Sequence, residues 1–272
     1  FDFKGEMLAE EIVPINKQQI QIPVSNIHAW SAESPTLYRC VVELGEDSYE
    51  TNFGFRTIRF DQNDLYINNQ KVFLIGLNRH QCYPYIGYAA VDSLQEEDVR
   101  ILKEELHVNA VRTSHYPQSQ SFIDACDRYG LYVFTEIPGW QHIGDDTWKQ
   151  QAIQNTKDMV LQYRNHPSII LWGVRINESL DDDELYAKTN QVARDLDPSR
   201  PTAGVRYLTK SHLLEDIYTF NDFSHHGDNK GALSKSEVMV DTHHPLIISE
   251  ANGHMFPTKS FDTQVRRQEH AL

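Results

Sequence analysis

Two glutamates, Glu178 and Glu250, have the residue type and the placement for acid–base or nucleophilic chemistry. Each follows a short apolar run, residues 169–174 for Glu178 and residues 246–249 for Glu250. A hydrolase that uses two carboxylates needs one that gives a proton to a leaving oxygen and a second that stays ionised as nucleophile or base. In enzymes that retain configuration the two carboxyl groups lie about 5–5.5 Å apart. Because Glu178 and Glu250 are far apart in the chain, they meet only if a curved sheet brings their strands together.

Polar side chains also end the other apolar runs of the chain. The residues concerned are Asn78, Arg79, His80, Arg112, His115, Glu136, Arg175, Asn177, Arg206, Asn221 and Asp222. Strands that repeatedly deliver charged groups and amides to one rim are costly without a polar ligand, because buried charges need partners. The pattern therefore predicts a polar binding site along one edge of a sheet.

Other hydrolytic chemistries find less support. The chain has 13 histidines, but neither HxH nor HExxH occurs, and these are the patterns that a catalytic zinc or dinuclear site would use. In the adjacent pairs His225-His226 and His243-His244 the two side chains are expected to point in different directions, so neither pair replaces these patterns. A serine hydrolase of the GxSxG type is not indicated either, because that nucleophile elbow is absent.

The elements that must position the two glutamates follow residue 57. A hairpin is predicted at residues 65–72, with its turn at Asn68-Asn69, and after it apolar runs alternate with amphipathic stretches. The predicted strands are 72–76, 110–112, 132–136, 169–174, 201–205, 217–220 and 246–249, and the predicted helices are 93–105, 119–129, 148–163, 184–196 and 234–240. Such alternation indicates an α/β fold with a parallel sheet whose faces are covered.

Two α/β folds fit this alternation. An open doubly wound sheet would carry a GxGxxG loop after its first strand, whereas the first strand here leads into Gly76-Leu77-Asn78-Arg79-His80. A (β/α)8 TIM-type barrel is therefore favoured, with its chemistry at the C-terminal ends of the strands. Only seven strands are predicted, so we expect residues 57–272 to form a catalytic barrel truncated after its seventh strand, with the last strand and helix beyond residue 272.

Residues 1–56 follow a different pattern. Short alternating runs at 19–23, 37–44 and 49–55 are separated by turn formers, which predicts antiparallel strands. Three or four strands are fewer than the seven or so that a sandwich needs. We therefore expect residues 1–56 to be part of an immunoglobulin-like β-sandwich.

The formal net charge of −14 makes some partners improbable. Such a surface repels phosphate backbones and anionic lipid, so neither nucleic acid nor a membrane is an expected partner. The three cysteines form neither a disulfide framework nor a CxxC site, which weakly favours a reducing, cytoplasmic compartment. Phe1 is not a natural start, so a targeting segment can precede it, and the sequence leaves open whether the full-length protein is a homo-oligomer.

Several motifs occur together in one order along the chain. They are WSAESPTLY from Trp30, FGFR from Phe53, GLNRH from Gly76, VRTSHYP from Val111, NHPSIILW from Asn165, NES from Asn177 and ISE from Ile248. With them, the chain resembles glycoside hydrolase family 2, which includes β-galactosidases and β-glucuronidases. The resemblance covers residues 28–255 and implies a retaining exo-β-glycosidase that acts on terminal β-galactosides. A β-glucuronidase, or a sugar-binding fragment without activity, stays as an alternative.

The resemblance also implies roles for the catalytic residues. Glu178 matches the general acid/base, and Glu250 matches the nucleophile that forms the glycosyl-enzyme. Asn177 matches the amide that binds the sugar 2-hydroxyl, a hydrogen bond that strengthens in the transition state. Arg112 matches the arginine beside the nucleophile, where a cation favours the ionised carboxylate.

Further residues are expected to bind substrate. His80 and His115 match histidines that contact sugar hydroxyls, and Asn221 and Arg206 end two other predicted strands. Trp140 is expected to stack on the sugar and stands where some relatives have a magnesium-binding glutamate. Because magnesium prefers oxygen ligands, we expect no catalytic metal and no cofactor. The expected substrate is a β-linked oligosaccharide or glycoside.

Overall fold

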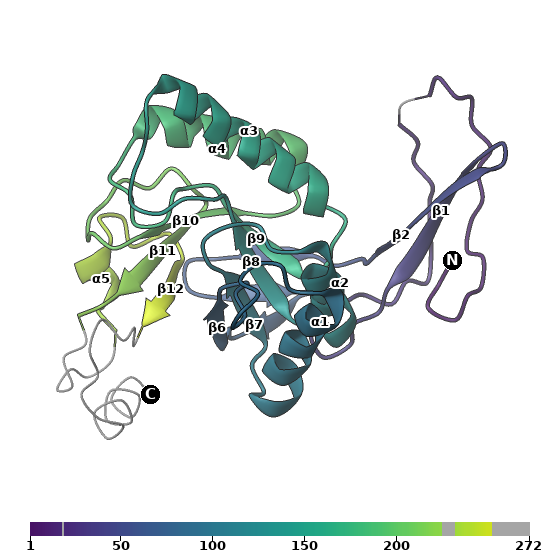
Figure 1. Cartoon of the computed structure of the whole chain (residues 1–272), viewed down its shortest axis with the longest axis horizontal. Coiled ribbons are helices and arrows are strands. Elements are labelled where there is room, and N and C mark those ends of the chain that lie inside the picture. Colours follow the sequence, from purple (N-terminus) through teal and green to yellow (C-terminus); the bar gives the residue numbers. More distant parts are fainter. Residues whose placement is uncertain (18, 225–231, 252–272) are drawn as a thin grey trace.

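A curved sheet of seven parallel strands forms the centre of the computed structural model, which describes residues 1–17, 19–224 and 232–251 (Figure 1). The strands are β6 (Gly76–Arg79), β7 (Ala110–Thr113), β8 (Tyr132–Glu136), β9 (Ile169–Gly173), β10 (Thr202–Arg206), β11 (Ile217–Asp222) and β12 (Leu246–Ala251). They lie side by side in chain order, from β6 at one edge to β12 at the other. The Asn78 side chain of β6 donates a hydrogen bond of 3.0 Å to the carbonyl of Ser249 in β12. The two edge strands therefore approach each other, and the sheet is a nearly closed barrel.

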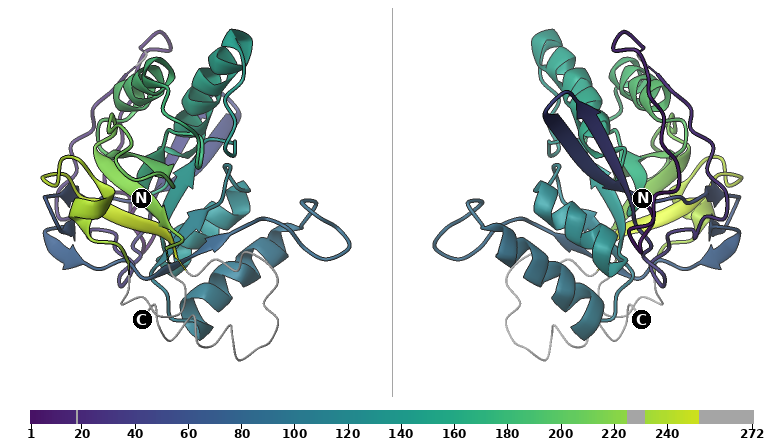
Figure 2. Two further views of the ribbon diagram at one scale, coloured as in Figure 1. Left: turned by 90° about the vertical axis from the view of Figure 1, so that its left-hand side faces the viewer. Right: turned by 90° about the vertical axis from the view of Figure 1, so that its right-hand side faces the viewer.

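Helices follow most strands and cover the outside of the barrel (Figure 2). They are α1 (Asp92–Arg100), continued by the π-helical turn η1 (Ile101–Glu105), α2 (Gln120–Tyr129), α3 (Asp146–Tyr163), α4 (Asp183–Leu196) and the short α5 (Lys235–Val238). The side chains of Ser119, Asp145 and Asp182 cap the first turns of α2, α3 and α4. No helix among the described residues is long and apolar enough to cross a membrane.

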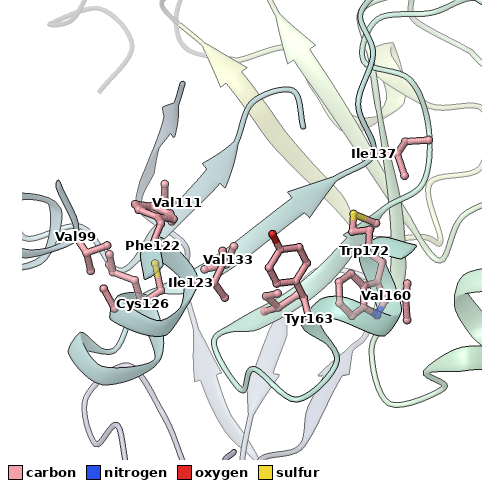
Figure 3. Close-up of a cluster of buried hydrophobic side chains, with 14 of the residues drawn as sticks. Val99, Val111, Phe122, Ile123, Cys126, Val133, Ile137, Val160, Tyr163 and Trp172 are labelled. Carbon is pink, nitrogen blue, oxygen red and sulfur yellow. The ribbon is translucent and has the colours of Figure 1, made fainter. Parts of the chain in front are cut away.

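The largest apolar core lies between the strands and the helices α1, α2 and α3 (Figure 3). Val111, Val133 and Trp172 come from the strands, and Phe122 and Val160 come from the helices. Strands β8 to β11 are buried along their whole length, which is typical of parallel strands covered on both faces. This rigid wall positions the polar residues at the strand ends.

The first barrel strand lies later in the chain than predicted. Residues 72–76 do not form a strand of the barrel; β6 begins only at Gly76, where it pairs with Ala110 of β7. The preceding apolar run belongs in part to a three-stranded antiparallel sheet of β3 (Ile58–Phe60), β4 (Leu65–Ile67) and β5 (Gln70–Val72). The predicted turn between β4 and β5 is confirmed, because Asn68 and Asn69 have φ angles of 50° and 64°.

The N-terminal region contains less regular structure than predicted. Strands β1 (Tyr38–Leu44) and β2 (Asp47–Phe53) form a two-stranded antiparallel ribbon that extends away from the barrel (Figure 1). The prediction of a strand at residues 19–23 is wrong, because its described residues have no sheet pairing. In the part of the chain that the structure describes, this ribbon is the sheet that precedes β3.

The N-terminal region is attached to the N-terminal ends of the barrel strands by polar contacts. The Trp30 indole donates to the carbonyl of Asp127 at 2.9 Å. The Arg56 guanidinium donates to the carbonyls of Pro167 at 2.8 Å and Ile169 at 2.9 Å. The WSAESPTLY, FGFR and NHPS motifs therefore meet at one interface, where their role is structural.

Replacing Arg56 by Met is expected to destabilise the fold by about 2 kcal/mol, because two carbonyls lose hydrogen bonds from a charged donor. Arg128→Met is the matched control, since that side chain is 46% exposed and pairs with Glu96 on the surface. Urea unfolding followed by circular dichroism measures both variants. Equal midpoints for the two variants would contradict a structural role for Arg56.

Candidate active site

Both glutamates lie at the C-terminal ends of barrel strands. Glu178 follows β9, is 8% exposed, and has a left-handed backbone with φ of 56°. Glu250 lies in β12, whose pairing with β11 shifts register between Phe220 and Asn221. Beyond this shift Asn221 pairs with Glu250, so an amide and a carboxylate lie side by side at the rim.

A chain of hydrogen bonds connects the two carboxylates. Arg112 donates to Glu250 Oε1 at 2.6 Å and to Asn177 Oδ1 at 2.7 Å. Asn221 Nδ2 contacts the same Asn177 oxygen at 3.3 Å and donates to Glu178 Oε1 at 2.9 Å. One guanidinium and two amides thus join Glu250 to Glu178, and the curved sheet brings together residues from β7, β9, β11 and β12.

Glu136, at the end of β8, holds Arg112 in place. Its carboxylate accepts two hydrogen bonds of 2.9 Å from Arg112 and is 1% exposed. Burial opposes the charge of Arg112, but the carboxylates of Glu136 and Glu250 outweigh it and raise the pKa of Arg112. Burial likewise opposes the charge of Glu136, yet Arg112 and His115 lower the pKa of Glu136. The pair is therefore ionised at neutral pH.

Two histidines extend this cluster. His115 Nδ1 lies 2.8 Å from Glu136 Oε1, and its Nε2 lies 3.9 Å from Glu250 Oε1. The His80 ring stands edge-to-face on the His115 ring, with centroids 5.4 Å apart. Burial and the neighbouring His115 lower the pKa of His80. His80 is therefore neutral at pH 7 and able to accept a hydrogen bond from a hydroxyl group.

Glu178 also has partners on the loop after β8. Its Oε2 atom lies 3.3 Å from the Trp140 indole nitrogen and 3.1 Å from the Gln141 amide nitrogen. The sequence placed Glu136 among the polar strand ends but gave it no role, and it did not indicate Gln141 at all. The position of Glu136 at the end of a predicted strand indicates a site residue, whereas no sequence pattern marks a glutamine in a loop.

Arg206 does not lie with the other predicted site residues. It is 1% exposed, forms an ion pair with Glu215, donates to the carbonyl of His212, and packs against Tyr218. Its side chain therefore points into the protein and away from the rim, which corrects the expectation that it contacts substrate. The structure brings together Glu178, Glu250, Asn177, Arg112, His80, His115, Trp140 and Asn221.

Potential metal ligands gather elsewhere among the described residues. Asp124, Asp127 and His166 lie close enough to share an ion. They sit near the N-terminal end of β9, where His166 Nδ1 is 2.6 Å from Asp127 and the Ser168 amide donates to the same carboxylate. This arrangement fits a structural histidine–aspartate pair at the opposite end of the barrel from Glu178.

Family models match almost the whole chain. The model for the TIM barrel domain of glycosyl hydrolases family 2 matches residues 58–268, and a second model for glycosyl hydrolases family 2 matches residues 4–56. Among curated proteins, a beta-galactosidase of Thermoanaerobacterium thermosulfurigenes is 52% identical over 92% of this chain and 36% of its own length. A beta-galactosidase of Rhizobium meliloti is 35% identical over 98% of this chain and 38% of its own length. This chain thus spans about a third of the length of these curated relatives.

Solved structures include enzymes with other named substrates. A GH2 beta-galacturonidase from Eisenbergiella tayi, bound to galacturonate, has a TM-score of 0.79 and 26% identity, and the match covers 93% of this chain and 50% of that chain. A Bacteroides uniformis beta-glucuronidase has a TM-score of 0.63 and 31% identity, and the match covers 71% of this chain and 27% of that chain. The chain therefore belongs to glycosyl hydrolase family 2.

Proposed function

We propose that the protein is a retaining exo-β-glycosidase that hydrolyses terminal β-galactosides with Glu178 and Glu250. The observation that carries the proposal is the orientation of Asn177 between the two glutamates. Its Oδ1 accepts from Arg112 and Asn221, while its buried Nδ2 has no hydrogen-bond partner among the described residues. A buried donor without a partner is costly, and a sugar hydroxyl would satisfy it.

The first step transfers the sugar to the enzyme. Glu178 gives its proton to the glycosidic oxygen while an oxygen of Glu250 bonds to the anomeric carbon and the bond to the aglycone breaks. Arg112 donates a hydrogen bond of 2.6 Å to Glu250 and orients the carboxylate that attacks. Asn177 would donate to the 2-hydroxyl, where a hydrogen bond is strengthened as the oxocarbenium-like transition state forms.

The second step releases the sugar. Glu178, now ionised, takes a proton from water, and the water oxygen displaces Glu250 from the anomeric carbon. Two inversions return the β configuration. The amides of Gln141 and Asn221 donate to the Glu178 carboxylate and hold it in place for this step.

The choice of galactose is supported by relatives and by the arginines. Curated beta-galactosidases are 49–52% identical to this chain. A glucuronidase would need a cation for the sugar carboxylate, and Arg175 and Arg206 are two arginines that follow predicted strands of the barrel. Arg175 is 1% exposed and bonds Asp181, and Arg206 bonds Glu215. Neither of these two arginines is therefore placed to bind a sugar carboxylate at the rim.

A panel of p-nitrophenyl glycosides tests this choice in the full-length natural protein. We expect kcat/KM for the β-galactoside to exceed that for the β-glucuronide by at least about 100-fold, since an unpaired sugar carboxylate would cost a few kcal/mol in this site. A higher kcat/KM for the glucuronide or galacturonide would overturn the sugar assignment while leaving the two-carboxylate mechanism intact.

A sugar-binding role without turnover is the second candidate. The observation in its favour is the edge of the sheet at β6, where Phe73, Ile75 and Leu77 are 78%, 58% and 47% exposed. A barrel with this much exposed apolar surface in and before its first strand can hold a sugar without holding the two carboxylates rigidly enough for catalysis. Galactoside hydrolysis by the 272 residues alone would remove this candidate.

A further inference from the structure

The loop between β8 and α3 contacts the Glu178 carboxylate on one side only. Trp140 and Gln141 both face Oε2, whereas Asn221 donates to Oε1. Asn221 also contacts Asn177, which is proposed to bind the sugar ring. The Oε1 side of Glu178 therefore faces the sugar, and the Oε2 side faces the loop.

The backbone of this loop is fixed to the segment that carries Glu178. The backbone N–H of Gln141 donates to the backbone carbonyl of Asn177 at 2.7 Å, and Trp140 pairs with Asn177 in an isolated parallel β-bridge. Gln141 has a φ of 62°, which costs free energy in a residue with a side chain. Gly139 has a φ of 148°, and a Cβ there would lie 2.6 Å from Ile176 Cδ1. Such a constrained loop holds both side chains in one orientation.

The Trp140 ring combines contact with the acid/base and exposure to solvent. Its nitrogen lies 3.3 Å from Glu178, yet the side chain is 57% exposed. Leu180 and Tyr207, which follow β9 and β10 at the same rim, are 63% and 41% exposed. An exposed indole face beside a proton donor suits a leaving group with a flat apolar surface.

We propose that Trp140 and Gln141 form the leaving-group subsite and adapt it to apolar, preferably aromatic, aglycones. Trp140 stacks on the aglycone, and Gln141 is a positioning residue that aims the Glu178 carboxyl at the glycosidic oxygen. This inference rests on the proposed acid/base role of Glu178 and does not depend on which sugar is cleaved.

The test compares leaving groups on one sugar in the full-length protein. Trp140→Ala is expected to lower kcat/KM for the p-nitrophenyl glycoside about 3- to 10-fold, because the variant loses the stacking contact between the indole and the aglycone ring. Gln141→Leu is expected to lower kcat/KM for the methyl glycoside about 10- to 100-fold, because that leaving group needs a well-aimed proton. In both variants kcat/KM for the glycosyl fluoride, which reports only the first step, should fall less than kcat/KM for the other two glycosides, since fluoride has no aglycone ring and needs little protonation.

Two control variants separate this role from general damage. Tyr85→Ala removes a fully exposed aromatic side chain from another rim loop, and Gln151→Leu removes an exposed amide of α3 that bonds Asn155. Both should match the parent on all three substrates. Equal losses on the fluoride and on the other glycosides, or no loss with either loop variant, would overturn the subsite. If the parent cleaves glucuronides and no galactosides, the same comparison on glucuronides tests the subsite, and only the sugar assignment fails.

Discussion

Replacing Glu250 by Gln is expected to reduce kcat for galactoside hydrolysis on the order of 10⁵-fold, the scale on which loss of a nucleophile slows other covalent enzymes. An amide has nearly the shape of the carboxylate but cannot form the glycosyl-enzyme. The fold should persist, because Arg112 keeps its two hydrogen bonds to Glu136 and its bond to Asn177. Steady-state kinetics with the p-nitrophenyl galactoside measures the effect.

The control for this variant is Glu184→Gln on α4. Its carboxylate is 79% exposed and pairs with Lys188 on the surface, so its removal should leave kcat unchanged. Thermal unfolding of both variants checks that loss of activity is not loss of structure. A folded Glu250→Gln variant with near-normal turnover would exclude Glu250 as the nucleophile.

Replacing Glu178 by Ala is expected to act differently on different leaving groups. Without the acid, kcat/KM for a methyl galactoside should fall about 10²- to 10⁴-fold, whereas a dinitrophenyl galactoside should still glycosylate Glu250 because its leaving group needs no proton. Release of the sugar from Glu250 would then be slow, because no base remains to take a proton from water. Added azide should restore turnover and yield the β-galactosyl azide, since an anionic nucleophile needs no base and fits the space that the side chain leaves.

The azide product distinguishes this role from a structural one. Glu178 is 8% exposed and accepts hydrogen bonds from Asn221 and Gln141, so its loss also leaves buried donors unpaired. Asn221→Ala disturbs the same network while keeping Glu178, and azide should not accelerate it. Equal losses for the methyl and dinitrophenyl substrates in Glu178→Ala, with no azide product, would contradict the acid/base assignment.

The sequence predicts the barrel strands well where they open on an apolar run. The strand at 132–136 is observed with the same bounds, and 169–174 and 246–249 differ by one or two residues from β9 and β12. Each of these strands opens on consecutive apolar residues, which marks where it begins. The first strand was misplaced because the apolar run leaves one sheet after Val72 and joins the barrel only at Gly76, and only pairing with Ala110 fixes where β6 begins.

The sequence predicts the site residues that end strands but not Gln141, which lies in a loop. Residues that end strands, such as Glu178, Glu250 and Arg112, converge because the sheet curves, and the motifs marked them in advance. Arg206 also ends a strand, yet its side chain is buried against Glu215 and points away from the rim, since successive side chains of a strand face opposite sides. Gln141 lies in a loop whose position depends on its hydrogen bond to Asn177, a contact that no local pattern encodes.

Trapping the covalent intermediate is the most direct test of the central claim. A 2-deoxy-2-fluoro galactoside with a dinitrophenyl leaving group slows both steps, and the activated leaving group lets the glycosyl-enzyme accumulate. We predict that mass spectrometry of the digested protein will find the fluorosugar on the peptide that contains Glu250. Label on Glu178 or Glu136, or turnover with inverted configuration and no label, would contradict the two-carboxylate mechanism proposed for this barrel.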